Sequence, residues 1–357
     1  MRNRNPYDKG GALGPEDDDV GPYDAAQAEE DLWFLPGPDS DEPADPFAPP
    51  LPRAPRKPLF ERADWRAAEA ALAQPLAALA LDLGRLIERA ESFGPQAGIR
   101  LALAEAAALG WWSGDRISSD RIALWSALRI GATGEDGAAL IRTAWAARRL
   151  AAPPVPGQGR AAAIAAHLGL KSDDPSGLVE DFSSLLPEPG ALGPVVRGCL
   201  AFHLWRALDE RVPPQRDIEA AVLGARLAIG HESAALGFLP LALAGTGALR
   251  AGGPAEQRLS AWIFGAHDAV LSALMMLDRL RRWRVQAEAG TADLSGRTPR
   301  LLIDGLLRHS MAAVPQLVAE TGASRPALLR NLAILEQRGL AREVTGQGRY
   351  RVWAARF

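Results

Sequence analysis

Residues 314–353, VPQLVAETGASRPALLRNLAILEQRGLAREVTGQGRYRVW, carry the most specific pattern in this chain. The first part has helical spacing and stops at Gly322, which readily takes the positive φ of a sharp corner. Ser324 is a favoured helix N-cap, and Pro326 suits the first turn of the helix that follows it. The stretch therefore predicts two short helices joined by a tight corner.

The helix after Ser324 separates apolar from polar residues. Its apolar face repeats at i, i+4 and i+7, through Leu328, Leu332 and Leu335. The other side carries side chains suited to phosphates and base edges, namely Arg325, Arg330 and Asn331, and ends with Arg338. We expect the leucines to pack inward and the polar side to face a ligand.

Strand-like segments follow at residues 340–344 and 350–353, joined by a Gly-rich, basic turn over residues 345–349. An apolar helix that begins near an N-cap at Thr298 precedes the pair. From Arg297 to the end, about ten arginines face four acidic residues. This order and charge predict a winged helix-turn-helix with a short β-hairpin wing, over residues 294–357.

Double-stranded DNA is the expected partner of this segment. We expect Ser324, Arg325, Arg330 and Asn331 to enter the major groove. The flanking backbone is assigned to residues of the wing, namely Thr345, Gln347, Arg349 and Arg351. The alternative is a helix-turn-helix used as a protein-docking or dimerisation module.

Composition bounds the rest of the chain. Its 357 residues allow two to three domains, with a net charge of −3. Residues 1–64 hold 7 basic and 15 acidic residues, and residues 1–58, rich in Pro, Asp and Gly, are expected to be disordered. The single cysteine, Cys199, in an apolar run, is expected to be a buried small hydrophobe. Without a signal peptide or an uninterrupted apolar span, a cytoplasmic protein that does not enter the membrane is expected.

Residues 59–293 show repeated helical periodicity and no strand alternation before residue 340, which predicts an all-helical bundle. The long helix around residues 262–284 is the candidate surface for a homodimer, which paired DNA half-sites would require. We interpret the tryptophans of this region as core aromatics: Trp111, Trp112, Trp125, Trp145, Trp205, Trp262 and Trp283.

Enzymatic motifs are poor. The pair His231-Glu232 begins like a zinc-protease helix, but Ala235 stands where the second histidine is needed. His203 fits a core histidine, and the Gly-rich segment 244–253 is interpreted as a loop because no strand precedes it. We therefore predict no catalytic, metal-binding or cofactor-binding residues; any small-molecule effector of the helical domain remains unspecified.

The C-terminal segment TGASRPALLRNLAILEQRGLAREVTGQGRYRVW resembles the winged helix that ends many Fic-type proteins. Residues 193–201, GPVVRGCLA, are similar to the helix that precedes the Fic active-site loop. That family's H-P-F-x-x-G-N-G-R loop is missing: Asp209, Glu210 and Arg211 stand near the expected histidine, and only residues 224–226 echo its end. The resemblance implies a degenerate Fic-like bundle without nucleotidyl transfer.

Over most of residues 60–357 the chain also resembles an uncharacterised alphaproteobacterial family, often plasmid-borne, that pairs a helical domain with a C-terminal helix-turn-helix. That resemblance, carried by residues 294–299 and 343–349, implies DNA binding at most. The expected function is DNA binding in transcriptional regulation. The rival readings are a relative of Fic-type nucleotidyltransferases, such as a toxin–antitoxin component, and a protein-interaction scaffold.

Overall fold

The computed structural model describes residues 60–128, 136–152, 160–170, 177–211, 213–229, 235–346 and 351–357. Over these residues the chain is mainly helical, with one small antiparallel sheet near the C-terminus, as the sequence predicts. The segment 1–58, for which we predict disorder, lies outside the described residues.

The helices of the first part are α1 (Arg62–Ala71), α2 (Ala73–Phe93), α3 (Pro95–Ser113), α4 (Ser119–Leu128), α5 (Gly137–Ala151), α6 (Arg160–Leu168) and α7 (Leu178–Leu185). The next helices are α8 (Pro194–Leu208), α9 (Gln215–Leu227), α10 (Gly247–Arg250) and α11 (Ala255–Ala289). α10 occupies four residues of the Gly-rich segment 244–253, so the prediction of a loop throughout that segment is wrong.

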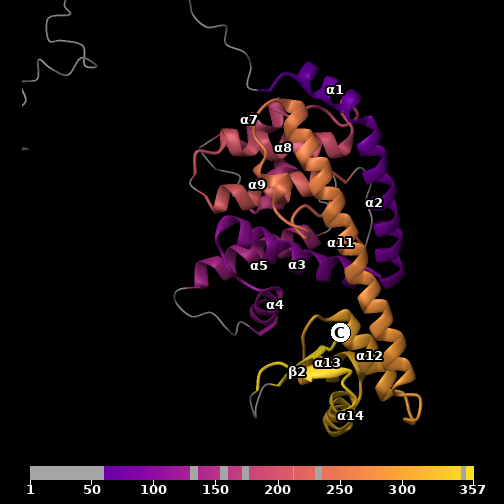
Figure 1. Ribbon diagram of the computed structural model, residues 1–357. Coiled ribbons are helices and arrows are strands. Elements are labelled where there is room, and N and C mark those ends of the chain that lie inside the picture. The colour runs from indigo at the N-terminus through magenta and orange to yellow at the C-terminus, as the bar shows by residue number, and fades with distance from the viewer. Residues whose placement is uncertain are drawn as a thin grey trace, which may run out of the picture. The chain divides into compact units, whose positions relative to one another are not determined.

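The 35-residue helix α11 is the central packing element. It contacts α1, α2, α8 and α10 along its length and reaches α12 near its end (Figure 1). His267 and Asp278 of α11 pair with Asp82 and Arg89 of α2. Among the described residues α11 is long and apolar enough to cross a membrane by length and composition, and α1 with α2 passes the same test as a bent pair. The buried side of α11, which includes Trp262 and Trp283, packs within the protein.

Two glycines allow α8 and α9 to approach closely. A Cβ atom at Gly198 would lie 2.5 Å from the carbonyl oxygen of Gly224 and 2.6 Å from the Cβ of Ala228. A Cβ atom at Gly224 would meet the carbonyl oxygen of Gly198 at 2.9 Å. Because side chains do not tolerate such distances, both positions require glycine for this helix spacing.

The C-terminal elements are α12 (Thr298–Arg308), β1 (Ala312–Ala313), α13 (Val314–Thr321), α14 (Arg325–Gln337), β2 (Ala341–Glu343) and β3 (Val352–Ala355). The sheet order is β1-β3-β2, and both pairings are antiparallel. Trp353 of β3 lies opposite Ala312 on one side and Glu343 on the other. The prediction of no strand before residue 340 is therefore wrong, because two alanines are too short a strand to show alternation.

Two further predictions need correction. Thr298, predicted as the N-cap of α12, is instead the first residue of that helix. Arg297 holds the N-cap position, and its side chain makes no capping hydrogen bond. Trp111 is 60% exposed, with the guanidinium of Arg116 5.7 Å from its ring centre, so it is not a core aromatic. The other tryptophans of that set are buried (Trp205, Trp262 and Trp283) or half-buried (Trp112, Trp125 and Trp145).

One hydrophobic core runs through the helical region into the C-terminal elements. It includes Trp262 of α11, Leu302 of α12 and Leu328 of α14. The described residues from Phe60 to Phe357 accordingly form one compact unit by their contacts. The division between residues 293 and 294 remains a prediction from the sequence.

Candidate nucleic-acid interface

The corner between α13 and α14 has the local geometry that the sequence predicts. Gly322 takes a left-handed conformation, with φ of 63°. The hydroxyl of Ser324 accepts a hydrogen bond from the backbone N–H of Ala327 at 3.4 Å and so caps α14. The corner therefore fixes where α14 begins relative to α13.

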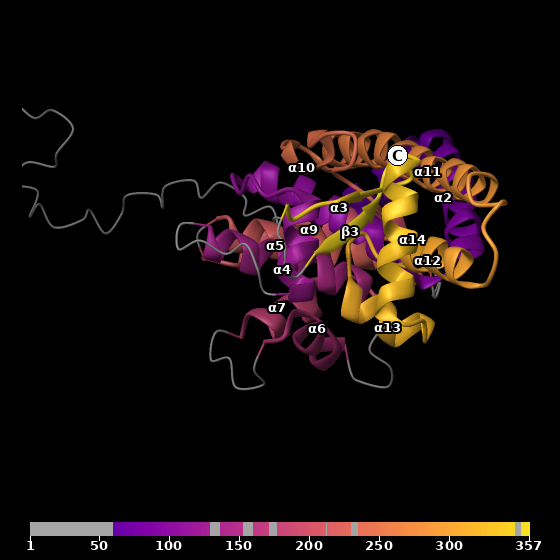
Figure 2. The same ribbon diagram turned by 90° about the horizontal axis from the view of Figure 1, so that it is seen from below.

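α14 has one buried side and one exposed side. Leu328, Leu332 and Leu335 have no exposed surface, and the helix packs against α12 and α13. Arg325 and Arg330 are exposed, as is the capping residue Ser324. In the view from below, α14 faces the viewer (Figure 2). The apolar pattern thus leaves two arginines of α14 accessible to a partner.

Asn331, assigned to the same surface, is partly engaged within the helix. Its side chain is half-buried, and its Nδ2 donates a hydrogen bond to the carbonyl oxygen of Ala327 at 2.8 Å. A donor bonded to the preceding turn is less available to the edge of a base. Arg330 is therefore the better placed of the two neighbours.

Hydrogen bonds of Thr345 link the described residues that follow β2 to the start of β3. The hydroxyl of Thr345 donates to Glu343 and accepts from the backbone N–H of Val352 at 3.4 Å. The hydrogen bond from Thr345 holds the pKa of Glu343 below its usual value, with a smaller contribution from the charge of Arg351. The side chain of Thr345 is therefore used internally, whereas Arg351 is exposed. Gln347 and Arg349 lie outside the described residues.

The arginines of this region divide into those paired internally and those that are not. Ion pairs join Arg308 to Glu320, Arg338 to Asp293 and Arg342 to Asp120, at 3.3, 2.6 and 2.8 Å. Arg338 thus ties the end of α14 to the turn after α11, and is not free on the polar side of α14. Within the described ranges no ion pair occupies four exposed arginines: Arg297, Arg300, Arg325 and Arg330.

Arg100 of α3 anchors the end of α12, a role that the sequence does not reveal. Its Nε donates to the carbonyl oxygen of Leu307 at 2.8 Å, and its Nη2 donates to those of Leu306 and His309. These carbonyls lie at the helix end, where no intrahelical donor serves them. Burial lowers the pKa of Arg100 to about 10, and the charge of Asp120 opposes that shift.

A second anchor is Trp283 of α11, whose indole N–H donates to the carbonyl oxygen of Leu340 at 2.8 Å. Arg100 is 207 residues from Leu307, and Trp283 is 57 residues from Leu340. Local periodicity carries no information about contacts at such separations. Together the anchors fix α12 and β2 against the long helices.

The segment where a Fic loop would lie has a different structure. Arg211 forms ion pairs with the buried carboxylates of Asp209 and Glu219, which raise its pKa above the usual value. Gly224 lies inside α9 against α8, and Arg226 donates to the carbonyl oxygen of Gly237 at 2.6 Å. These groups are used in packing and internal hydrogen bonds.

The buried histidine and cysteine of α8 behave as core residues, as predicted. Cys199 has no exposed surface, and burial raises the pKa of its thiol. Burial, with the charges of Arg258 and Arg206, lowers the pKa of His203 to about 3. In the part of the chain that the structure describes, no three His, Cys, Asp or Glu residues come together as a metal site.

No protein-family model matches the sequence, and no curated protein is significantly similar to it.

Proposed function

We propose that residues 298–357 form a winged helix-turn-helix that binds double-stranded DNA, and that the protein regulates transcription. The observation that carries the proposal is the element order α12-β1-α13-α14-β2-β3, with sheet order β1-β3-β2 and two accessible arginines on α14. A winged helix inserts the second helix of its corner into the major groove and lays its hairpin on the flanking backbone. In this reading α14 is the recognition helix.

The roles of the interface residues follow from their exposure. Arg325 lies in the first turn of α14, so it meets the phosphates at the groove edge, and Arg330 is exposed further along the same helix. Arg351 serves the flanking backbone from the start of β3. Arg297 and Arg300, at the start of α12, extend the accessible positive charge. Such a surface gives salt-dependent binding.

The test measures how the full chain binds native genomic DNA fragments at increasing salt concentrations. Fluorescence anisotropy monitors the binding. Arg330→Ala should weaken binding several-fold and reduce the slope of log K against log salt by about 0.9, the value for one lost phosphate contact. The matched control is Arg66→Ala, which removes an exposed arginine of α1. An unchanged slope for Arg330→Ala contradicts this role, and no binding at low salt by the wild type favours the scaffold reading.

We also propose that the protein is a homodimer through the outward side of α11, which would present two recognition helices to paired half-sites. Phe264, Leu271 and Met275 on this side are 56, 41 and 55% exposed. Asp268 and Arg282 each lie seven residues from Met275, in opposite directions. An antiparallel copy centred on Met275 therefore places each Asp268 opposite Arg282 of the partner subunit. A second copy of α11 thus complements both the apolar and the charged residues of this side.

Light scattering at micromolar concentration tests the dimer. The wild type should have twice the mass of one chain. Asp268→Arg places like charges opposite each other and should give a monomer, whereas the double variant Asp268→Arg with Arg282→Asp should restore the dimer. A monomeric wild type, or a charge swap that fails to restore association, refutes this arrangement. DNA binding also implies the compartment that holds DNA, and we propose the cytoplasm.

A further inference from the structure

A cavity of about 490 Å³ lies where the helical region meets the C-terminal sheet. Its walls come from α3, the start of α4, α11 and the residues around the end of β3. Pockets that hold small molecules in proteins have volumes of about 300–1,000 Å³ and occur where packed substructures meet. The size and position of this cavity are those of a small-molecule site.

The charge of the cavity wall is strongly one-sided. Four arginines line it, namely Arg100, Arg279, Arg342 and Arg356, and among the described lining residues the one acidic side chain is Asp120. Asp120 is paired with Arg342 at 2.8 Å, and the guanidinium of Arg100 is bonded to carbonyl oxygens of α12 and the loop after it. Neither Arg279 nor Arg356 has a side-chain hydrogen bond or ion pair to any residue in the described ranges. Two cations are therefore available to an anion in the cavity.

Apart from Ser119 and Ser310, the side chains of the rest of the wall are apolar. Leu103 of α3 and Met276 and Leu280 of α11 supply apolar surface to the cavity, and Phe357 lies beside them. The ring of Phe357 meets that of Trp283 edge-on, with 6.0 Å between ring centres. An apolar wall beside unpaired cations fits a ligand with an apolar body and one anionic end.

From these observations we infer that the cavity binds a small organic anion, a carboxylate with an aromatic or branched apolar body, whose charged end lies between Arg279 and Arg356. The apolar body contacts Leu103 of α3 and Met276 and Leu280 of α11. The indole of Trp283, next to Phe357, reports occupancy. The inference concerns a site separate from α14 and does not depend on DNA binding.

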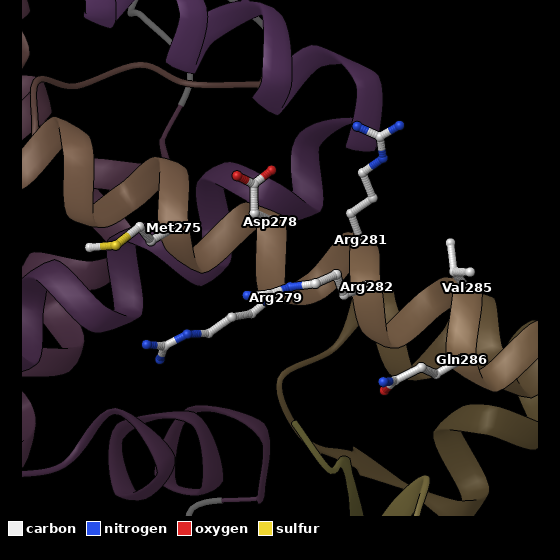
Figure 3. A pocket seen from close by; sticks show the side chains of 7 residues that line it. All are labelled: Met275, Asp278, Arg279, Arg281, Arg282, Val285 and Gln286. Carbon is white, nitrogen blue, oxygen red and sulfur yellow. The ribbon is translucent and has the colours of Figure 1, made fainter.

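α11 supplies a matched control for the cationic end of the site. Arg279 and Arg281 are both exposed, but their side chains leave the helix on different sides (Figure 3). Arg279 lines the cavity, whereas Arg281 does not. The pocket drawn in Figure 3, which both residues line, is a separate one on α11. Replacing either residue removes the same charge from the same helix, so only contact with the ligand distinguishes them.

The test titrates benzoate, 3-methylbutanoate and neutral benzamide into the full chain without DNA. Tryptophan fluorescence and calorimetry measure the binding. At the ligand efficiency of ordinary drug-sized compounds, ligands this small bind with Kd on the order of 1–10 mM, so the titration extends to tens of millimolar. At least one carboxylate should bind saturably, and benzamide at least about tenfold more weakly than benzoate, as expected for a lost charge-assisted contact. Arg279→Gln with Arg356→Gln should weaken carboxylate binding at least about tenfold, and Arg281→Gln less than about twofold.

Near-ultraviolet circular dichroism must show that each variant keeps the wild-type fold. No saturable binding of either carboxylate overturns the inference, as do equal affinities for benzoate and benzamide. Equal losses in the double variant and in Arg281→Gln also overturn it, because they indicate attraction to the general charge of α11. A loss of DNA affinity by Arg330→Ala alone would leave these outcomes unchanged, so failure of one proposal is distinguishable from failure of the other.

Discussion

Replacing Arg100 by methionine should show how much of the stability depends on the anchor between α3 and α12. The change keeps an apolar stem and removes the guanidinium that serves the carbonyls of Leu306, Leu307 and His309. Hydrogen bonds to a charged group contribute about 1.5–3 kcal/mol each, so three contribute about 4.5–9 kcal/mol. A pKa of about 10 in place of 12.5 corresponds to about 3 kcal/mol against the buried charge. The difference leaves a net loss of about 1–6 kcal/mol on truncation.

Urea unfolding of the full chain, followed by circular dichroism and tryptophan fluorescence, measures this loss. The control is Arg85→Met, which removes an exposed arginine paired with Asp82 three residues earlier in α2. Such a surface pair contributes about 0–1 kcal/mol. If Arg100→Met is no less stable than Arg85→Met, the three hydrogen bonds do not anchor α12 and the reasoning from their geometry is refuted.

Three other changes have defined outcomes. Glu105 is fully buried, and its Oε1 accepts hydrogen bonds from the N–H groups of Leu241 and Ala242. Burial raises the pKa of its carboxyl from 4.5 to about 7. The stability that this raised pKa contributes is present below pH 4.5 and is lost as the pH rises through 7. Glu105→Gln should therefore gain up to about 3 kcal/mol relative to the wild type between pH 5 and 8 in urea titrations, and a pH-independent difference contradicts this. Gly198→Ala should cost about 2 kcal/mol or more in thermal unfolding, because its Cβ would meet backbone of α9 at 2.5 Å, and a neutral effect would contradict that close packing. Gly84→Ala, with nothing within 4 Å of the new Cβ in α2, should instead gain about 0.5–1 kcal/mol in the same assay, and a loss would show an unseen constraint.

The corner and cap of α14 could be predicted from the sequence because their causes are local. Gly322 and Ser324 act through their own backbone angles and a hydrogen bond three residues away. The inward spacing of Leu328, Leu332 and Leu335 follows from helical periodicity alone. Such local features form independently of contacts with distant parts of the chain, so the sequence alone can predict them.

Features that depend on distant contacts could not be predicted. The strand β1 exists because Ala312 and Ala313 pair with β3, about 40 residues later, and alanine has no β preference of its own. Arg338, predicted on the polar side of α14, forms an ion pair with Asp293, and no pattern within α14 reveals this contact. The cavity beside Arg279 requires helices and strands from three parts of the chain.

The length of α11 has a consequence for how this protein can change. Because both ends of its buried side are fixed, at Trp262 against α8 and α9 and at Trp283 against Leu340, the angular phase between the two positions is set. One inserted residue between them would rotate everything downstream by about 100° and advance it by about 1.5 Å. Exposed positions outside the proposed dimer face, such as Arg281, can vary by substitution, but the number of residues between the two tryptophans is constrained. The number of residues in α11 between Trp262 and Trp283 is therefore fixed by packing at both ends, and we expect insertions and deletions to be tolerated in the loops instead.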